Sequence, residues 1–311
     1  MGTTLHVTAL AADRGAGVAA IEAAFAAVAR LDSLLSTWRD DSEIARLNAA
    51  PAGAPVPLSA ELFTLLAEAL RWCRATGGAF DPAVGPLVDA WDLRGRGRMP
   101  SAAELARARA AAGCDAVTLD AATRTGRRRS RLSWLDTGGF GKGAALRSAL
   151  AALVGRGAEA GLLDFGGQVL VFGHPPAGDG WRIPVAHPAH RTAAALKLRL
   201  PGGLSAATSA QSERFVTLAD TTLGHILDPR SGRPVAPWGS VTVVAADPAE
   251  ADALSTALFV LGPEAGPRWA EHHAVAALFL VDRDGRLEVR SAGGADRFVV
   301  QDVKDTITIG G

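Results

Sequence analysis

The chain has no tyrosine, only two cysteines among its 311 residues, and a formal net charge of zero. Without an excess of positive charge, the sequence gives no indication of a nucleic-acid partner or of binding at a membrane surface. No apolar run approaches the roughly 20 residues that cross a bilayer, which argues against membrane insertion. The first residues carry neither a basic nor an apolar segment, so no signal peptide is predicted. We expect a cytoplasmic protein, or an exported or membrane-associated one if a leader has been removed.

The two cysteines, Cys73 and Cys114, do not have the spacing of a metal site. They can form a disulfide only if the fold brings their Cα atoms within about 7 Å of each other. We interpret them as two free thiols, which fits a reducing compartment.

A cluster of arginines between residues 124 and 131 is the one local exception to the balanced charge. It interrupts the run from Val117 to Leu135, where the tip of a hairpin fits well. We interpret the cluster as a solvated turn and keep a docking patch as the alternative.

Apolar residues at helical spacing predict helices in the first half of the chain and strands in the second. Ser59 is a predicted cap, and Ser101 with Glu104 forms a capping box. A late helix is predicted to begin after Asp247 and to end at Gly262. The other predicted helices cover residues 18–35, 58–76, 101–112 and 143–153. The predicted strands cover residues 3–10, 116–119, 131–135, 162–165, 168–172, 181–185, 196–200, 214–218, 241–245, 274–281 and 287–289.

Helices grouped early and strands grouped late favour an α+β fold over regular βαβ alternation. The length permits one large domain or two smaller ones. We predict a single domain over residues 1–311 and keep two lobes that enclose the ligand site as the alternative.

Asp252 and Thr256 are four residues apart on the predicted late helix, which places a carboxylate and a hydroxyl on one face. Two oxygen ligands are a plausible half of a magnesium site, because Mg2+ prefers oxygen and keeps water or phosphate as further ligands. The alternative is an exposed Asp and a Thr that bonds back to the preceding turn.

The glycine-rich segment 136–143 follows a predicted strand and precedes a helix. Glycines let the backbone approach a ligand, and a helix N-terminus favours phosphate. Lys142 adds a positive charge, but Gly143 follows it, so the segment is not a Walker loop. A loose dinucleotide fingerprint, with Asp164 further on, and a plain strand–helix turn are the alternatives.

Three other segments carry polar or aromatic side chains in places where a ligand could bind. His225 could act as a base with Asp228 orienting it, although a lone His is more often structural. Residues 78–87 form a loop that looks exposed, with Phe80 and Asp81 on it. Trp38 lies among polar residues and could stack on a flat ring, or be partly buried in the core.

Taken together, these segments resemble the ApbE family of FAD:protein FMN transferases, in order along nearly the whole chain. One such motif would be weak, whereas eight in the right order are specific. The resemblance implies an α+β fold of mixed and antiparallel sheets with helices packed against them, an ApbE-like (T-fold-like) architecture. The matching segments are residues 1–4, 36–48, 78–87, 136–143, 163–168, 207–209, 225–232 and 240–262.

The resemblance also implies Mg2+ as cofactor and FAD as substrate. It assigns the metal to the side chains of Asp252 and Thr256 and to the backbone carbonyl of Gly141. His225 is implied to help deprotonate the acceptor hydroxyl, and Lys142 to act on the phosphates. The residues that match the family's flavin contacts are Met1, Trp38, Ala79, Phe80, Asp81, Asp136, Lys142 and Ile226.

The implied reaction transfers FMN from FAD to a threonine of an acceptor flavoprotein and releases AMP. Hydrolysis of FAD to FMN and AMP at the same site is the alternative, and a flavin-binding module and a nicotinamide dehydrogenase are weaker ones. The sequence departs from the family at Gly141, where Ala is usual, and after Ser209, where the usual Gly-Asp-Tyr is missing. With no tyrosine in the chain, a stacking or phenolic role falls to Trp38 or is absent.

Overall fold

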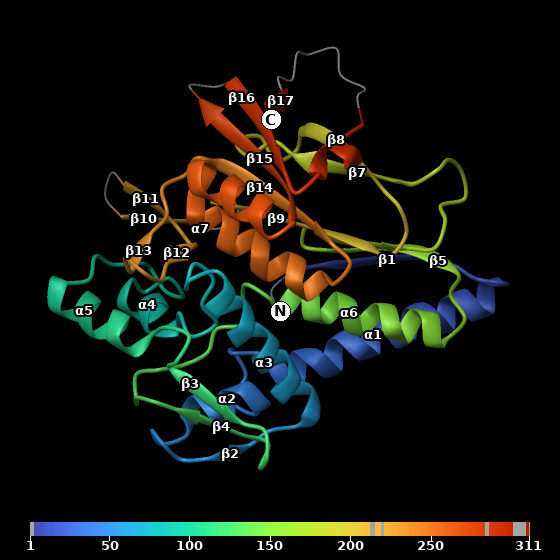
Figure 1. Cartoon of the computed structure of the whole chain (residues 1–311). Coiled ribbons are helices and arrows are strands. Elements are labelled where there is room, and N and C mark those ends of the chain that lie inside the picture. Colours follow the sequence, from blue (N-terminus) through green and yellow to red (C-terminus); the bar gives the residue numbers. More distant parts are fainter. Residues whose placement is uncertain (1–2, 212–214, 219–220, 284–285, 301–308, 311) are drawn as a thin grey trace. The chain divides into compact units, whose positions relative to one another are not determined.

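The computed structural model describes residues 3–211, 215–218, 221–283, 286–300 and 309–310 (Figure 1). Two compact units make up the chain. Unit 1 contains Met1–Leu31, Gly141–Ser212 and Pro237–Gly311, and unit 2 contains Asp32–Phe140 and Glu213–Ala236. The single domain over residues 1–311 stays a prediction, and each unit is described by itself.

Unit 1 is built on one large sheet whose strands follow the order β1-β5-β6-β9-β14-β15-β16-β17. Neighbouring strands are antiparallel, except that β16 and β17 are parallel. The strands are β1 (Leu5–Leu10), β5 (Ala160–Phe165), β6 (Gln168–Phe172), β9 (Leu204–Ala210), β14 (Gly239–Ala245), β15 (Ala276–Arg283), β16 (Arg286–Ala292) and β17 (Ile309–Gly310).

A two-residue turn at Gly166 and Gly167 joins β5 to β6. Both residues have positive φ, 61° and 86°, which is the geometry of a type I′ hairpin and is accessible to glycine without a Cβ clash. The turn sets Leu163 opposite Leu170 in the antiparallel register. The two strands predicted from sequence here are therefore confirmed.

The large sheet is covered on both faces. The helices α6 (Gly141–Gly155) and α7 (Pro248–His272) contact each other and the sheet strands on one face (Figure 1). The hairpin of β7 (Trp181–Ala186) and β8 (Ala194–Leu200), with the short 3-10 helix Ala295–Phe298, packs against the other face. A long helix, α1 (Arg14–Leu35), follows β1.

The helix α7 begins as predicted, with Asp247 as its cap and Pro248 in the first turn. Gly262 has a φ of 79°, which breaks the helical geometry at the residue where an end was predicted. The chain resumes a helix directly afterwards, because Pro263 is tolerated in a first turn. The predicted end is therefore a break, and the helical segment continues to His272.

Unit 2 combines short helices with small sheets. Ser59 caps α3, and the capping box of Ser101 and Glu104 begins α5, as predicted. The helices are α2 (Glu43–Ala49), α3 (Ala60–Ala75), α4 (Gly85–Ala90) and α5 (Ala102–Ala111). The strands are β2 (Val56–Pro57), β3 (Val117–Asp120), β4 (Thr125–Arg128), β10 (Phe215–Leu218), β11 (Thr221–Gly224), β12 (Leu227–Asp228) and β13 (Arg233–Pro234).

The arginine cluster differs from its prediction. The strand that pairs with β3 is β4, so the predicted strand over residues 131–135 is wrong and the turn lies near Arg124, at φ 49°. Arg128 is buried and donates to the carbonyl oxygens of Ala50 and Ser133. The fixed carbonyl acceptors offset part of the cost of burying the guanidinium, and the interpretation as a solvated turn is wrong for this residue.

The cysteines also differ from their prediction, because Cys73 and Cys114 form a disulfide. The Cα atoms lie 5.6 Å apart, although 41 positions separate them in sequence. The fold places the last turn of α3 beside the segment that precedes β3, which sequence spacing does not reveal. The interpretation as two free thiols is therefore wrong.

The observed mixture of an extended antiparallel sheet and packed helices confirms the predicted α+β class. In the part of the chain that the structure describes, no helix combines the length and apolar character that crossing a membrane requires.

Candidate functional site

The start of α7 is fixed by contacts with α6, and it carries the first group of predicted site residues. The Asp247 carboxylate accepts from the backbone N–H of Ala249 at 2.9 Å and from Arg147 Nε of α6 at 3.0 Å. A cap that is also an ion pair holds the first turn of α7 beside α6.

Asp252 lies one turn further along α7 and is 3% exposed. Its Oδ1 lies 2.9 Å from Lys142 Nζ, and its Oδ2 accepts from the backbone N–H of Gly143 at 3.1 Å. Lysine and carboxylate are separated by 110 positions in sequence. The ammonium and the N-terminus of α6 together compensate the buried carboxylate.

The close approach of the two helices requires glycine at position 143. A Cβ there would lie 2.1 Å from the carbonyl oxygen of Pro248. Any larger residue would push the α6 N-terminus away from α7, so Gly143 allows its own N–H to reach Asp252.

The hydroxyl of Thr256 donates to the backbone carbonyl of Asp252 at 3.3 Å, so it lies on the same helical face as predicted. This is the back-bond that the alternative interpretation gave to Thr256, whereas the exposed Asp of that alternative is wrong, because Asp252 is buried. Gly141, the third predicted metal ligand, is the first residue of α6 and is buried. The three predicted ligands and Lys142 all belong to unit 1.

The donors in this group fit a hard divalent cation. A carboxylate, a hydroxyl and a carbonyl are the oxygen ligands that Mg2+ accepts. Lys142 already places a positive group on the Asp252 carboxylate. Among the described residues, no cluster of three or more His, Cys, Asp or Glu side chains has metal-site geometry. With Asp252 as the carboxylate of this group, positions would remain for water and phosphate oxygens.

A second group of predicted residues lies in unit 2, where residues 79–81 are buried instead of exposed. The Phe80 ring meets the rings of Trp72 and Phe140 edge-on at centroid distances of 6.5 and 6.4 Å. The prediction of an exposed loop is wrong, because Ala79, Phe80 and Asp81 are 1%, 2% and 5% exposed. The Phe80 side chain belongs to the core, so a nucleotide contact there would have to be made by the backbone.

The Asp81 carboxylate organises the backbone around it. It accepts from the N–H groups of Ala83 at 2.8 Å and Gly113 at 2.7 Å. Burial raises the pKa of Asp81, and these two hydrogen bonds oppose the rise. Gly113 precedes Cys114, so Asp81 and the disulfide connect the same two segments.

Asp136 lies beside the buried segment, because its N–H donates to the carbonyl of Pro82 at 2.8 Å. Its carboxylate accepts from Arg94 Nη2 at 2.7 Å and from the N–H of Gly138 at 2.7 Å. Arg94 also donates to the Thr37 hydroxyl at 2.7 Å. The structure thus brings together Asp136, the 79–81 segment and the residues next to Trp38, all within unit 2.

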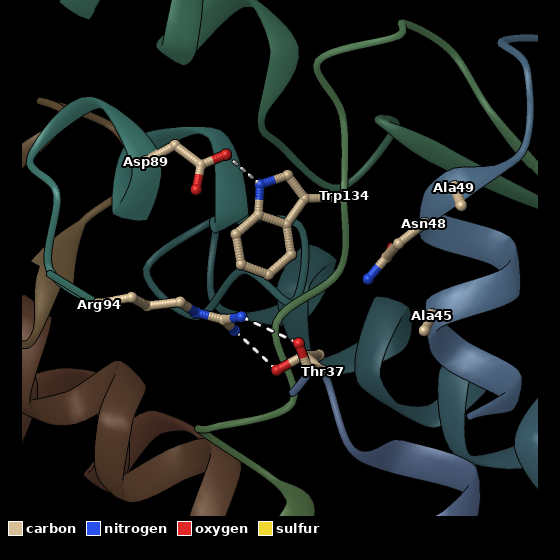
Figure 2. Close-up of a pocket in the computed structure, with 7 residues that line it drawn as sticks. All are labelled: Thr37, Ala45, Asn48, Ala49, Asp89, Arg94 and Trp134. Carbon is tan, nitrogen blue, oxygen red and sulfur yellow. Dashed lines mark hydrogen bonds between the residues drawn. The ribbon is translucent and has the colours of Figure 1, made fainter. Parts of the chain in front are cut away.

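A cavity of about 330 Å³ adjoins Arg94 (Figure 2). Figure 2 shows the Trp134 indole facing both Asp89 and Arg94, with its Nε1 donating to Asp89 Oδ2 at 2.7 Å. Burial raises the pKa of Asp89, and the indole hydrogen bond opposes this. The lining residues are Thr37, Ala45, Asn48, Ala49, Asp89, Arg94 and Trp134.

His225 and Ile226 lie between β11 and β12, with His225 partly exposed and Ile226 buried. Asp228, which the sequence suggested as the orienting partner of His225, receives Arg230 Nε at 2.8 Å. Its carboxylate therefore organises the turn before β13. Met1 lies outside the described residues.

Sequence reasoning did not single out Arg94, Asp89 or Trp134. Arg94 contacts residues 57 and 42 positions away, and the spacing of residues within one segment cannot predict such contacts. Asn48, in the motif that begins at Ser36, donates to and accepts from the backbone of Leu135 at 2.9 and 2.8 Å, so its role here is to hold two segments together.

The sequence of this chain matches a family model and several known proteins. Residues 1–279 match the family model described as the ApbE family. The FAD:protein FMN transferase of Treponema pallidum is 32% identical over 92% of this chain and 83% of its own. That of Vibrio cholerae is 30% identical over 80% of this chain and 75% of its own.

Solved structures with the same architecture superpose on this chain. The ApbE protein of Thermotoga maritima superposes with a TM-score of 0.87 at 26% identity, covering 96% of this chain and 97% of its own. The flavin transferase ApbE of Vibrio cholerae superposes with a TM-score of 0.83 at 26% identity, covering 96% of each chain. The resemblance read from the sequence motifs and the predicted architecture are confirmed, and the chain belongs to the ApbE family.

Proposed function

We propose that the protein is a magnesium-dependent FAD:protein FMN transferase that attaches FMN to a threonine of an acceptor flavoprotein. The observation that carries this proposal is the buried Asp252, which Lys142 and the N-terminus of α6 hold next to a threonine hydroxyl. Relatives covering most of the chain are named for the same activity.

The proposed reaction breaks the phosphoanhydride bond of FAD and forms a phosphoester with the acceptor. The acceptor hydroxyl oxygen bonds to the FMN phosphorus, the bond to the bridging oxygen breaks, and AMP leaves with that oxygen. Bound Mg2+ would supply charge neutralisation at the pyrophosphate. Asp252, Thr256 and the Gly141 carbonyl would hold it, and the Lys142 ammonium would contribute a second positive charge.

The proposed flavin contacts are Met1, Trp38, the backbone at residues 79–81, Asp136 and Ile226. His225 is proposed to accept the proton of the threonine hydroxyl, since a neutral imidazole suits this step near pH 7. If water replaces the hydroxyl, the same steps yield free FMN and AMP.

The direct test is incubation with FAD and MgCl2, with and without EDTA, followed by chromatography. A flavoprotein fragment with an acceptor threonine is added, and the same fragment with that threonine replaced by alanine is the control. We expect AMP, together with FMN covalently bound to the threonine fragment only, and no products with EDTA. Equal AMP and free FMN with either fragment would make the protein an FAD pyrophosphatase. Absence of AMP would contradict both activities.

Replacing His225 with alanine is expected to slow transfer about 100-fold, the usual contribution of a general base, while FAD affinity changes little. Single-turnover transfer and the Kd for FAD separate the two effects. His174→Ala, at an exposed histidine of unit 1, is the control and should change neither. Equal losses in transfer and in affinity would instead assign His225 a structural or nucleotide-binding role.

The Cys73–Cys114 disulfide is evidence about the cellular compartment in which the protein folds. Disulfides form and persist in oxidising compartments and are rare in a reducing cytoplasm. We therefore propose the exported alternative over the cytoplasmic one. Fractionation of cells that express the native gene, followed by thiol labelling of the recovered protein, checks both points.

A further inference from the structure

The guanidinium of Arg94 lies over two indole rings. Its Cζ lies 4.6 Å from the ring centroid of Trp38 and 4.5 Å from that of Trp134. Arginine suits this position because its planar, weakly hydrated cation stacks on aromatic faces. The Trp134 ring is itself held by the hydrogen bond of its Nε1 to Asp89.

The same guanidinium is fixed at its edge. Arg94 donates from Nη1 to the Thr37 carbonyl at 3.1 Å and from Nη2 to the Thr37 hydroxyl at 2.7 Å. It also donates to Asp136 Oδ2 at 2.7 Å. Stacking and hydrogen bonding together leave the guanidinium little freedom to rotate, so it is a rigid support.

Trp38 depends on such a support. Its side chain is among the large hydrophobic side chains left exposed, at 67%. An indole with this exposure has few packing contacts to select one rotamer. The cation over its ring and the two bonds from Arg94 to the preceding residue fix it from one side and leave indole surface open to solvent.

We propose that Arg94 is a positioning residue for flavin, which holds the Trp38 indole in the orientation that receives the isoalloxazine ring. This inference rests on the proposed function. It adds a role for a residue outside the motifs that carry the family resemblance. Arg94 also bonds to Asp136, a proposed flavin contact, but the inference assigns the larger part of its effect to Trp38, so most of its effect on FAD should depend on the indole being present.

A double-mutant cycle on FAD affinity tests that dependence. The proteins are wild type, Arg94→Ala, Trp38→Ala and the double variant, each titrated with FAD and followed by flavin fluorescence. We expect Arg94→Ala to weaken FAD binding about tenfold, which lies between the values for an exposed and a desolvated cation–π contact. In the Trp38→Ala background, the same substitution should weaken binding by less than about twofold. Independent, multiplicative losses would overturn the inference.

Two further variants separate positioning from general stability. Arg94→Lys keeps the charge but loses the planar fork, so it should lose most of the affinity, and bound flavin should be less quenched at saturation than in wild type. Arg98→Ala removes a surface pair with Glu104 at 2.9 Å in the same unit and should leave FAD binding unchanged. Melting curves without FAD identify any variant that has failed to fold. If Arg94→Ala does not fold, the FAD affinity of Arg94→Lys tests the inference.

The outcomes distinguish the inference from the proposed function. Wild-type protein that binds and turns over FAD, with Arg94→Ala and Arg94→Lys unchanged, would overturn only the role of Arg94. Wild-type protein that neither binds nor cleaves FAD would overturn the proposed function and the inference with it.

Discussion

Replacing Asp252 with alanine is expected to abolish turnover of FAD. In the proposed site, Asp252 supplies the only carboxylate to the metal, and it also holds Lys142 and the Gly143 N–H at the start of α6. Changes in the second shell of a metal site commonly cost 10- to 100-fold, and loss of the carboxylate ligand should cost at least about 100-fold. The measurements are AMP release at saturating MgCl2 and the Mg2+ concentration that gives half-maximal rate.

The alanine variant also removes partners from buried polar groups, so part of its defect will be structural. Asp252→Asn is the sharper variant, because the amide oxygen can still accept from Gly143 while its metal affinity falls. We expect it to melt close to wild type and to remain inactive. Asp179→Ala, which breaks an exposed pair with Arg199, is the control and should retain full activity. Full activity of folded Asp252→Asn or Asp252→Ala in magnesium would refute the metal assignment.

Local signals in the sequence predicted local structure well. The capping box at Ser101 and the cap and proline at Asp247 and Pro248 depend on neighbouring residues only, and both helices begin where expected. The double glycine at residue 166 marks a turn whose positive φ values glycine adopts readily. The arginines were expected at the tip of the hairpin, but Arg128 lies in the strand itself, where the carbonyl of Ala50, 78 positions away, helps to accommodate its buried guanidinium.

In the candidate site, too, features set by neighbouring residues were predicted and contacts between distant segments were not. Helical spacing placed Thr256 on the same face as Asp252, since four residues make about one turn. The contact of Asp252 with Lys142 spans 110 positions, and only the family resemblance connected the two. Phe80 and Asp81 looked exposed because glycine and proline surround them, yet their contacts come from Trp72, Phe140 and Gly113. Such contacts depend on tertiary packing, which spacing within one segment does not encode.

Loss of the Cys73–Cys114 disulfide is expected to lower the free energy of unfolding by up to about 4 kcal/mol. The bond closes a loop across 41 positions, and the chain-entropy estimate for a loop of that length lies between those for 15 and 100 residues. A loss of this size corresponds to a fall in Tm of about 6 °C for a chain of 311 residues, with an unfolding entropy of about 2.1 cal/mol/K per residue. Thermal melts with and without dithiothreitol, and of the Cys73→Ser/Cys114→Ser variant, measure it.

Titration of thiols in the denatured, unreduced protein is the control, and we expect none until reductant is added. The double variant should melt at the temperature of the reduced wild type and should not respond to dithiothreitol. Two thiols in the unreduced protein, or equal melting temperatures with and without reductant, would contradict the bond or its contribution.

The disulfide is not the only link between its two segments, and this limits the expected effect. Asp81 accepts the N–H of Gly113, the residue before Cys114, and Arg74 Nη2, next to Cys73, pairs with Asp115 Oδ1 at 3.8 Å. These bonds form only in the folded protein, whereas the disulfide also restricts the unfolded chain. Reduction should therefore leave the junction in place at room temperature and act mainly by enlarging the unfolded ensemble. FAD affinity at 25 °C should then be nearly equal in the oxidised and reduced protein while their melting temperatures differ.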